Sequence, residues 1–150
     1  MDVYENMKNH GITLPDPPAK GGLYAPVKLF AGKLAYASGC GPISAVRGKL
    51  GAQVSEEEGM QCARECMLNV LAVLQREIGD LNRVKSVAKI TCFVASDDSF
   101  TRQPAVANGA SGLLAEVFGE AVGIPSRSAI GVNVLPGDIP VEVEALFEIE

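Results

Sequence analysis

The sequence predicts an α+β fold in which a mixed β-sheet carries two helices on one face, in the order β-β-α-β-α-β-β. Apolar residues recur at three- and four-residue intervals between Ser55 and Gly79, which is typical of a long helix with one buried side. Residues 84–95 are dominated by β-branched side chains, and residues 141–149 largely alternate between apolar side chains and glutamates, so both segments are expected to be strands. Two helices for about five strands favour a sheet with its helices on one face.

Length, charge and hydropathy limit the classes of protein to which the chain can belong. The chain has 150 residues, of which 47% are hydrophobic, which suits one domain with one core. Its formal net charge of -5 argues against a surface built for nucleic acid. No apolar stretch reaches the roughly 18 to 20 residues that span a bilayer, and the first 18 residues lack the pattern of a signal or transit peptide. We therefore expect a cytoplasmic protein without nucleic-acid or membrane partners.

The N-terminal region is expected to be irregular and to lead into a hairpin. Residues 1–22 are polar and rich in Pro and Gly, which predicts an arm laid over the surface of a single domain formed by residues 23–150. Residues 27–31 and 34–38 flank Gly32 and Lys33, a spacing that suits a two-residue turn. The glycine-rich stretch 38–42 that follows is either a tight turn or a backbone brought close to a ligand.

Both helices carry start and stop signals. Ser55 and Glu58 form a capping-box pattern, and Met60 heads the apolar stripe of the first helix. The second helix is expected from Pro104, with its stop at Gly119. Asn108, Gly109 and Gly112 weaken this second helix, so either it packs closely on another element or Asn108 faces a ligand.

Two strands close the chain, at residues 127–134 and 141–149. Two helices cannot cover both faces of a five-stranded sheet, because each helix is about 10 Å wide and the strands lie about 4.8 Å apart. Other copies of the chain are expected to cover the second face. The sequence therefore predicts a homo-oligomer with its ligand site between subunits.

Cysteine and histidine usage limits the chemistry. The chain has four cysteines, Cys40, Cys62, Cys66 and Cys92, and one histidine, His10. A structural zinc site needs about four ligands, and catalysis by a Ser-His or Cys-His pair needs a suitably placed histidine. We therefore expect reduced, partly buried thiols, no metal and no cofactor.

Arg127 is the most informative single residue. It opens the strongly apolar stretch 127–134, and a guanidinium cannot give up its proton to lower the cost of burial. It therefore needs an anion. That anion is either the carboxylate of a small-molecule ligand, bound by two parallel hydrogen bonds, or an acid of the chain itself such as Glu144 or Glu148.

The block Pro-Ser-Arg127-Ser-Ala-Ile-Gly-Val-Asn-Val-Leu-Pro136, followed by Val-Glu142-Val-Glu144-Ala, resembles the signature of the RidA/YjgF family of reactive-intermediate deaminases. Residues 24–26, 34–39 and 69–71 extend the resemblance, which runs from residue 24 to residue 149. It implies a chorismate-mutase-like fold and a homotrimer with clefts between subunits. It also implies hydrolysis of enamine/imine intermediates such as 2-aminoacrylate to 2-keto acids and ammonia, as in a 2-iminobutanoate/2-iminopropanoate deaminase.

The resemblance also implies residue roles. Arg127 would hold the substrate carboxylate, and Glu142 would act as general base on water and then help to protonate the departing nitrogen. The pocket would be lined by Tyr24, Ser38, Gly39 and Asn108. Ala129 stands where many members have cysteine, which excludes a thiol role there but leaves a backbone contact.

Geometry and substrate choice leave alternatives open. If the last two strands formed a simple hairpin, Arg127 and Glu142 would lie roughly 16 Å apart along it, so the two residues would have to meet across a subunit boundary or the strands would have to pair differently. The arm and the stretch 45–51 are longer than in compact members, which leaves the substrate unassigned. The alternative function is a non-catalytic trimeric binding module for small carboxylate metabolites, or a chaperone-like protein.

Overall fold

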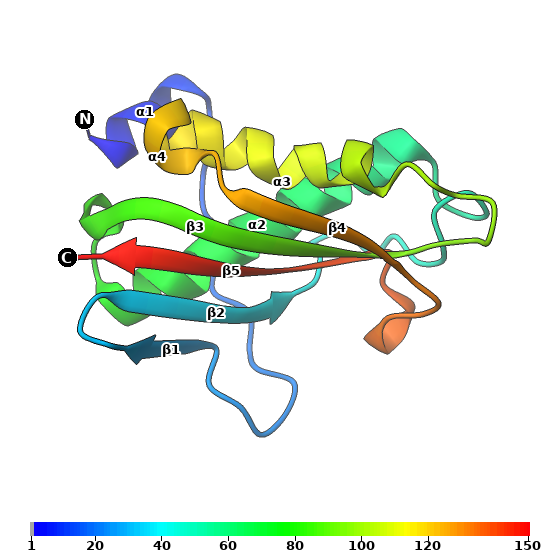
Figure 1. Cartoon of the computed structure of the whole chain (residues 1–150), viewed down its shortest axis with the longest axis horizontal. Coiled ribbons are helices and arrows are strands. Elements are labelled where there is room, and N and C mark those ends of the chain that lie inside the picture. The colour runs from blue at the N-terminus through cyan, green and yellow to red at the C-terminus, as the bar shows by residue number, and fades with distance from the viewer. Residues whose placement is uncertain (1) are drawn as a thin grey trace.

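A computed structural model describes residues 2–150 as a five-stranded mixed sheet with two long helices, α2 (Glu56–Ile78) and α3 (Gln103–Phe118), on one face (Figure 1). The strands are β1 (Val27–Phe30), β2 (Leu34–Cys40), β3 (Val84–Ala95), β4 (Ser126–Val132) and β5 (Val141–Ile149). Their spatial order is β1-β2-β5-β3-β4, and every pairing is antiparallel except that of β3 with β4. The predicted α+β class, with two long helices on one face, is confirmed.

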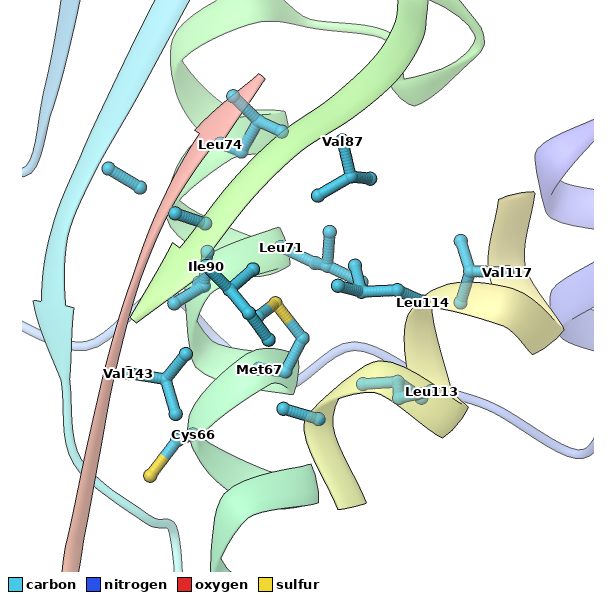
Figure 2. Close-up of a cluster of buried hydrophobic side chains, with 14 of the residues drawn as sticks. Cys66, Met67, Leu71, Leu74, Val87, Ile90, Leu113, Leu114, Val117 and Val143 are labelled. Carbon is cyan, nitrogen blue, oxygen red and sulfur yellow. The ribbon is translucent and has the colours of Figure 1, made fainter. Parts of the chain in front are cut away.

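The core lies between the sheet and the two long helices. Figure 2 shows side chains of α2 and α3 meeting those of β3 and β5. Alternate residues of β5 are buried, as its sequence pattern predicts, while the intervening residues face the other side of the sheet. The labelled members of this cluster are Cys66, Met67, Leu71, Leu74, Val87, Ile90, Leu113, Leu114, Val117 and Val143.

Helix α2 begins and ends where the sequence predicts. The Glu58 backbone N–H donates to Ser55 Oγ at 3.2 Å, and the Ser55 backbone N–H donates to Glu58 Oε2 at 2.8 Å, which completes the capping box. The C-terminal Gly79 has φ 83°, a conformation that glycine adopts without strain. Met60 is 37% exposed, so its assignment to the buried stripe was wrong.

The glycine in the middle of α3 serves close helix packing. A Cβ at Gly109 would overlap the backbone carbonyl of Met60 in α2, whereas a Cβ at Gly112 would meet nothing within 4 Å. Asn108 contacts Arg127, as described below. The two explanations considered for this weakened helix therefore apply to two adjacent residues: Gly109 lets α3 approach α2, and Asn108 faces a candidate site.

Several boundaries and connections differ from those expected. Phe30 pairs with Leu34, so the β1–β2 turn has three residues, with φ 55° at Ala31 and 73° at Gly32, and not the predicted two. Strand β4 ends at Val132 and not at 134, and a short helix α4 (Glu120–Gly123) precedes it. Two 3₁₀ turns, Leu81–Arg83 and Pro136–Asp138, were also not predicted.

The N-terminal arm contains a helix that the sequence analysis did not predict, α1 (Val3–Asn9). Val3, Met7 and Ile12 are buried, and the Asn6 side-chain amide donates to the Val117 carbonyl at 3.1 Å. From α1, which packs beside α3, the arm runs behind the sheet to the loop before β1 (Figure 1). These contacts hold the first part of the arm against the rest of the domain. Met1, the first residue of the predicted arm, lies outside the described residues.

The sheet face opposite the helices is uncovered, as expected from the element count. Phe30, Tyr36 and Ile130 are 42%, 40% and 42% exposed. None of the helices within residues 2–150 combines the length and apolar character needed to cross a membrane.

Candidate functional site

A cavity of about 570 Å³ opens on the uncovered face of the sheet, which we call the open-face cavity. It contains four of the residues predicted for the site, namely Tyr24, Ser38, Gly39 and Glu142. Its full lining is Gly21, Tyr24, Ser38, Gly39, Phe93, Pro136, Glu142 and Glu144.

The end of β2 positions one wall of this cavity. The pairing of β2 with β5 is irregular between Ala37 and Cys40, and Ser38 donates from its backbone N–H to the Pro26 carbonyl at 2.9 Å. The Ser38 hydroxyl donates to the Ala25 carbonyl at 2.7 Å. These bonds hold the segment before β1 against the end of β2. The glycine-rich stretch is thus the irregular end of a strand, brought close to a candidate site.

Glu142 lies against Gly39 in a partly dehydrated setting. A Cβ at Gly39 would stand 2.8 Å from Glu142 Cδ, so only glycine leaves room for this carboxylate. Burial raises the pKa of Glu142, and the negative charge of Glu144 raises it further. A carboxylate with a raised pKa is a stronger base, which suits it to accept a proton from water.

Glu144 is a second carboxylate that the sequence analysis did not assign to the site. It follows Glu142 by two residues, so the two share one face of β5, a relation that the period of a strand already predicts. The Tyr36 hydroxyl of β2 donates to Glu144 Oε1 at 3.1 Å, which fixes the position of this carboxylate. Phe93, level with Glu142 on β3, was also missed.

Arg127 lies at the sheet edge in β4, held by neutral side chains of α3. Its Nη1 donates to Asn108 Oδ1 at 2.7 Å and to Ser111 Oγ at 3.3 Å. Among residues 2–150, no acidic side chain lies within salt-bridge distance of this guanidinium. Glu148 instead pairs with Lys33 at 3.5 Å, and Glu144 accepts from Tyr36. The structural ion pair considered for Arg127 is therefore wrong within this chain.

The predicted site residues form two groups in one chain. Arg127 and Ala129 are level with the buried Ile90 and Cys92 of β3, whereas Glu142 is level with Phe93 on the open face. Arg127 and Glu142 are therefore offset by three residues along the strand direction, about 10 Å, and by two strand spacings across the sheet, also about 10 Å. Strand β4 pairs with β3 and not with β5, so the last two strands do not form the simple hairpin considered from sequence. One chain therefore does not bring Arg127 to Glu142.

The thiols are poorly suited to nucleophilic chemistry. Cys62, Cys66 and Cys92 are buried, and burial raises the pKa of Cys40 to about 11, with Glu142 adding to the effect. Within the described part of the chain, no three acidic, cysteine or histidine side chains gather closely enough to hold a metal ion.

The family model described as "YjgF/chorismate_mutase-like, putative endoribonuclease" matches residues 5–146. The chain belongs to this family. The resemblance inferred from the Arg127 and Glu142 blocks is thereby confirmed, together with the fold that it implies.

Three similar proteins match the chain almost end to end. A Trypanosoma cruzi protein called TCP17 is 43% identical over 151 residues, covering 98% of this chain and 94% of its own length. The structure of Atu1372 from Agrobacterium tumefaciens, of unknown function, is 36% identical with a TM-score of 0.89, covering 99% of this chain and 92% of that one. A Shewanella oneidensis MR-1 structure described as "a putative endoribonuclease" is 29% identical with a TM-score of 0.94, covering 99% and 100%.

Proposed function

We propose that this protein hydrolyses reactive enamine/imine intermediates of the 2-aminoacrylate type to 2-keto acids and ammonia. The site is built by two copies in a homotrimer: Arg127 of one copy binds the substrate carboxylate, and Glu142 of the next copy acts on water.

The observation that supports this proposal most directly is how the guanidinium of Arg127 is held. Its Nη1 is oriented by two neutral groups, Asn108 and Ser111, and no carboxylate of the described residues neutralises its charge. A half-buried guanidinium held this way presents its remaining N–H groups in a fixed plane, which suits a carboxylate bound by two parallel hydrogen bonds. Such a bond would fix the substrate while leaving its C=N group free to react.

The second step uses Glu142. Water attacks the carbon of the C=NH₂⁺ group while Glu142 accepts a proton from that water, giving a carbinolamine. Glu142 then returns that proton to the nitrogen. A lone pair of the hydroxyl oxygen forms the C=O bond as the C–N bond breaks with its electron pair on nitrogen, the hydroxyl proton passes to the departing ammonia through Glu142, and a 2-keto acid and ammonium leave. The raised pKa of Glu142 favours the first transfer, because the group binds a proton more tightly than an ordinary glutamate, and the return transfer is driven by the amine nitrogen of the carbinolamine, which is a stronger base than a carboxylate.

Because Arg127 and Glu142 lie apart within one chain, the proposed site needs two copies. Arg127 belongs to the helix side at the edge strand β4, and Glu142 belongs to the open face. Exposed apolar side chains on that face, including Phe30, Tyr36 and Ile130, support its contact with other copies. An oligomer that covers this face would bring one copy's edge toward the next copy's open-face cavity.

The family model and the Shewanella protein carry the name endoribonuclease. The charge of this chain argues against carrying that activity over. Its net charge is -5, and the open-face cavity contributes two carboxylates, Glu142 and Glu144, and no basic side chain, so it would repel a phosphate backbone. A small substrate with a cationic iminium nitrogen fits this cavity better.

Ammonia release from freshly generated 2-aminoacrylate tests the proposal, with the wild type compared against Arg127→Ala and Arg127→Lys. Both variants are expected to lose most of the rate enhancement, because a single ammonium cannot reproduce the planar fork of the guanidinium. Equal rates in wild type and Arg127→Ala would reject the enzyme and favour a non-catalytic module that binds carboxylate metabolites. Near-full activity in Arg127→Lys would show that positive charge alone suffices.

A further inference from the structure

A second cavity, of about 180 Å³, lies under the N-terminal arm, and we call it the arm cavity. Residues 18–20 of the arm form one side, residues 38–42 form another, and Asn69 and Val73 of α2 face it from the helix layer. Tyr24 and Pro26 complete the lining.

The arm cavity adjoins the open-face cavity. Tyr24, Ser38 and Gly39 line both, and the consecutive arm residues Lys20 and Gly21 line one cavity each. The boundary between them therefore includes a residue without a side chain, Gly39, which also contacts Glu142. A molecule whose reacting carbon lies beside Glu142 would have its substituents close to this boundary.

The lining of the arm cavity suits an apolar group. Three prolines and Val73 supply apolar surface, no carboxylate lines the cavity, and the raised pKa of Cys40 keeps its thiol neutral. Polar groups also line it, but the Ser38 hydroxyl already donates to the Ala25 carbonyl and the Asn69 amide to the Gly41 carbonyl. Lys20 is exposed, which lets its ammonium remain in water while its stem covers the cavity. An apolar cavity of roughly 150 Å³ can bind benzene, so this one has room for a side chain of about six carbons.

The arm cavity is held in shape from several sides. The arm is anchored by α1, where the Val3 backbone N–H donates to Asn82 Oδ1 at 2.9 Å. The Gly21 backbone N–H donates to the Tyr24 hydroxyl at 3.0 Å, and the buried Asn69 amide donates to the Gly41 carbonyl at 2.9 Å. Little ordering is then needed when a ligand enters, which favours binding.

We infer that the arm cavity is the subsite for the substrate's side chain, so that the arm and Val73 select 2-imino acids with apolar side chains larger than methyl. This inference rests on the proposed function and adds the substrate class to it. The 99% coverage of this chain by the Atu1372 and Shewanella structures means that the matched region includes the arm.

The test compares two 2-keto acids as product ligands, pyruvate and 4-methyl-2-oxopentanoate, in calorimetric titrations of wild type, Val73→Phe and Val73→Ala. The first substitution fills the arm cavity and the second enlarges it. We expect the affinity ratio of the larger acid to pyruvate to fall at least tenfold in Val73→Phe and to rise in Val73→Ala, because one buried methylene changes binding about fourfold. Cys40→Met, which narrows the cavity from the strand side, replaces Val73→Phe if that variant does not fold.

Ammonia release from the corresponding imines, generated from alanine and leucine by an amino-acid oxidase, separates this inference from the proposed function. A size-dependent affinity ratio without ammonia release would leave the subsite in place and reject the deaminase. Ammonia release with an affinity ratio that neither substitution changes would overturn the subsite alone. Failure of both 2-keto acids to bind wild type would overturn the subsite and count against the proposed function.

Discussion

The carboxylate of Glu142 in β5 packs directly on the backbone of Gly39 in the neighbouring strand β2. A Cβ at residue 39 would lie 2.8 Å from Glu142 Cδ and 3.2 Å from its Oε1. Gly39 does not have a φ in the left-handed region, so the backbone there accepts any residue. Glycine is therefore required by the space that Glu142 occupies and not by the conformation of the chain.

This contact predicts the effect of Gly39→Ala. The added methyl group would displace the Glu142 carboxylate by about 1 Å, and a displacement of that size can lower a rate about 10²-fold. The fold should persist because the backbone is unstrained and the displaced side chain can turn into the open-face cavity. Deaminase kinetics and thermal unfolding check both parts. Full activity in a folded Gly39→Ala protein would show that the position of Glu142 is unimportant.

The pH dependence of catalysis should report on Glu144. The pKa of Glu142 is raised first by burial and then by the charge of Glu144, and a general base works only when deprotonated. Activity should therefore fall as the pH drops through the pKa of Glu142. Removing the neighbouring charge lowers that pKa, so the acidic limb of kcat/KM should move to lower pH in Glu144→Gln.

Glu148→Gln is the matched control for this pH profile. Glu148 lies on the same strand and face but pairs with Lys33 and does not line the open-face cavity. Its removal should leave the acidic limb in place. An unchanged or upward-shifted limb in Glu144→Gln would mean that Glu142 is not the group that titrates.

Two glycines of α3 predict opposite stability changes. In Gly109→Ala the new methyl would overlap the Met60 carbonyl, so the helices must separate, at a cost of about 1–3 kcal/mol in the free energy of unfolding. In Gly112→Ala the methyl meets nothing within 4 Å, and the helix should gain about 0.5–1 kcal/mol. Urea denaturation of both variants measures the difference. Similar stability in the two proteins would contradict the close crossing of α2 and α3.

Elements with strong local signals could be predicted from sequence. The bounds of β3 and β5, and the start and stop of α2, follow from β-branched runs, alternation, a capping box and a terminal glycine. Helix α1 was missed because it has only seven residues and buries only Val3 and Met7, which is too short a pattern beside the proline-rich stretch that follows. Its stability comes from packing against distant residues.

The grouping of site residues depends on strand pairing that no local pattern contains. The resemblance identified Arg127 and Glu142 individually. Which face of the sheet each residue lies on became clear only from the strand order, in which β5 lies between β2 and β3, while β4 forms the edge. The contact of Ser111 with Arg127 and that of Tyr36 with Glu144 also join residues distant in the sequence, so no local pattern predicts them. Glu144 could have been predicted, because residues two apart on a strand share a face.

Complementation between two inactive variants tests most directly whether two copies share one site. Arg127→Ala and Glu142→Gln proteins are mixed, unfolded and refolded together, and ammonia release from 2-aminoacrylate is measured. If Arg127 of one copy acts with Glu142 of the next, random mixing in equal amounts rebuilds about a quarter of the sites, and about a quarter of wild-type activity should return. Activity no higher than that of the separate variants, in a mixed oligomer of confirmed composition, would contradict a shared site.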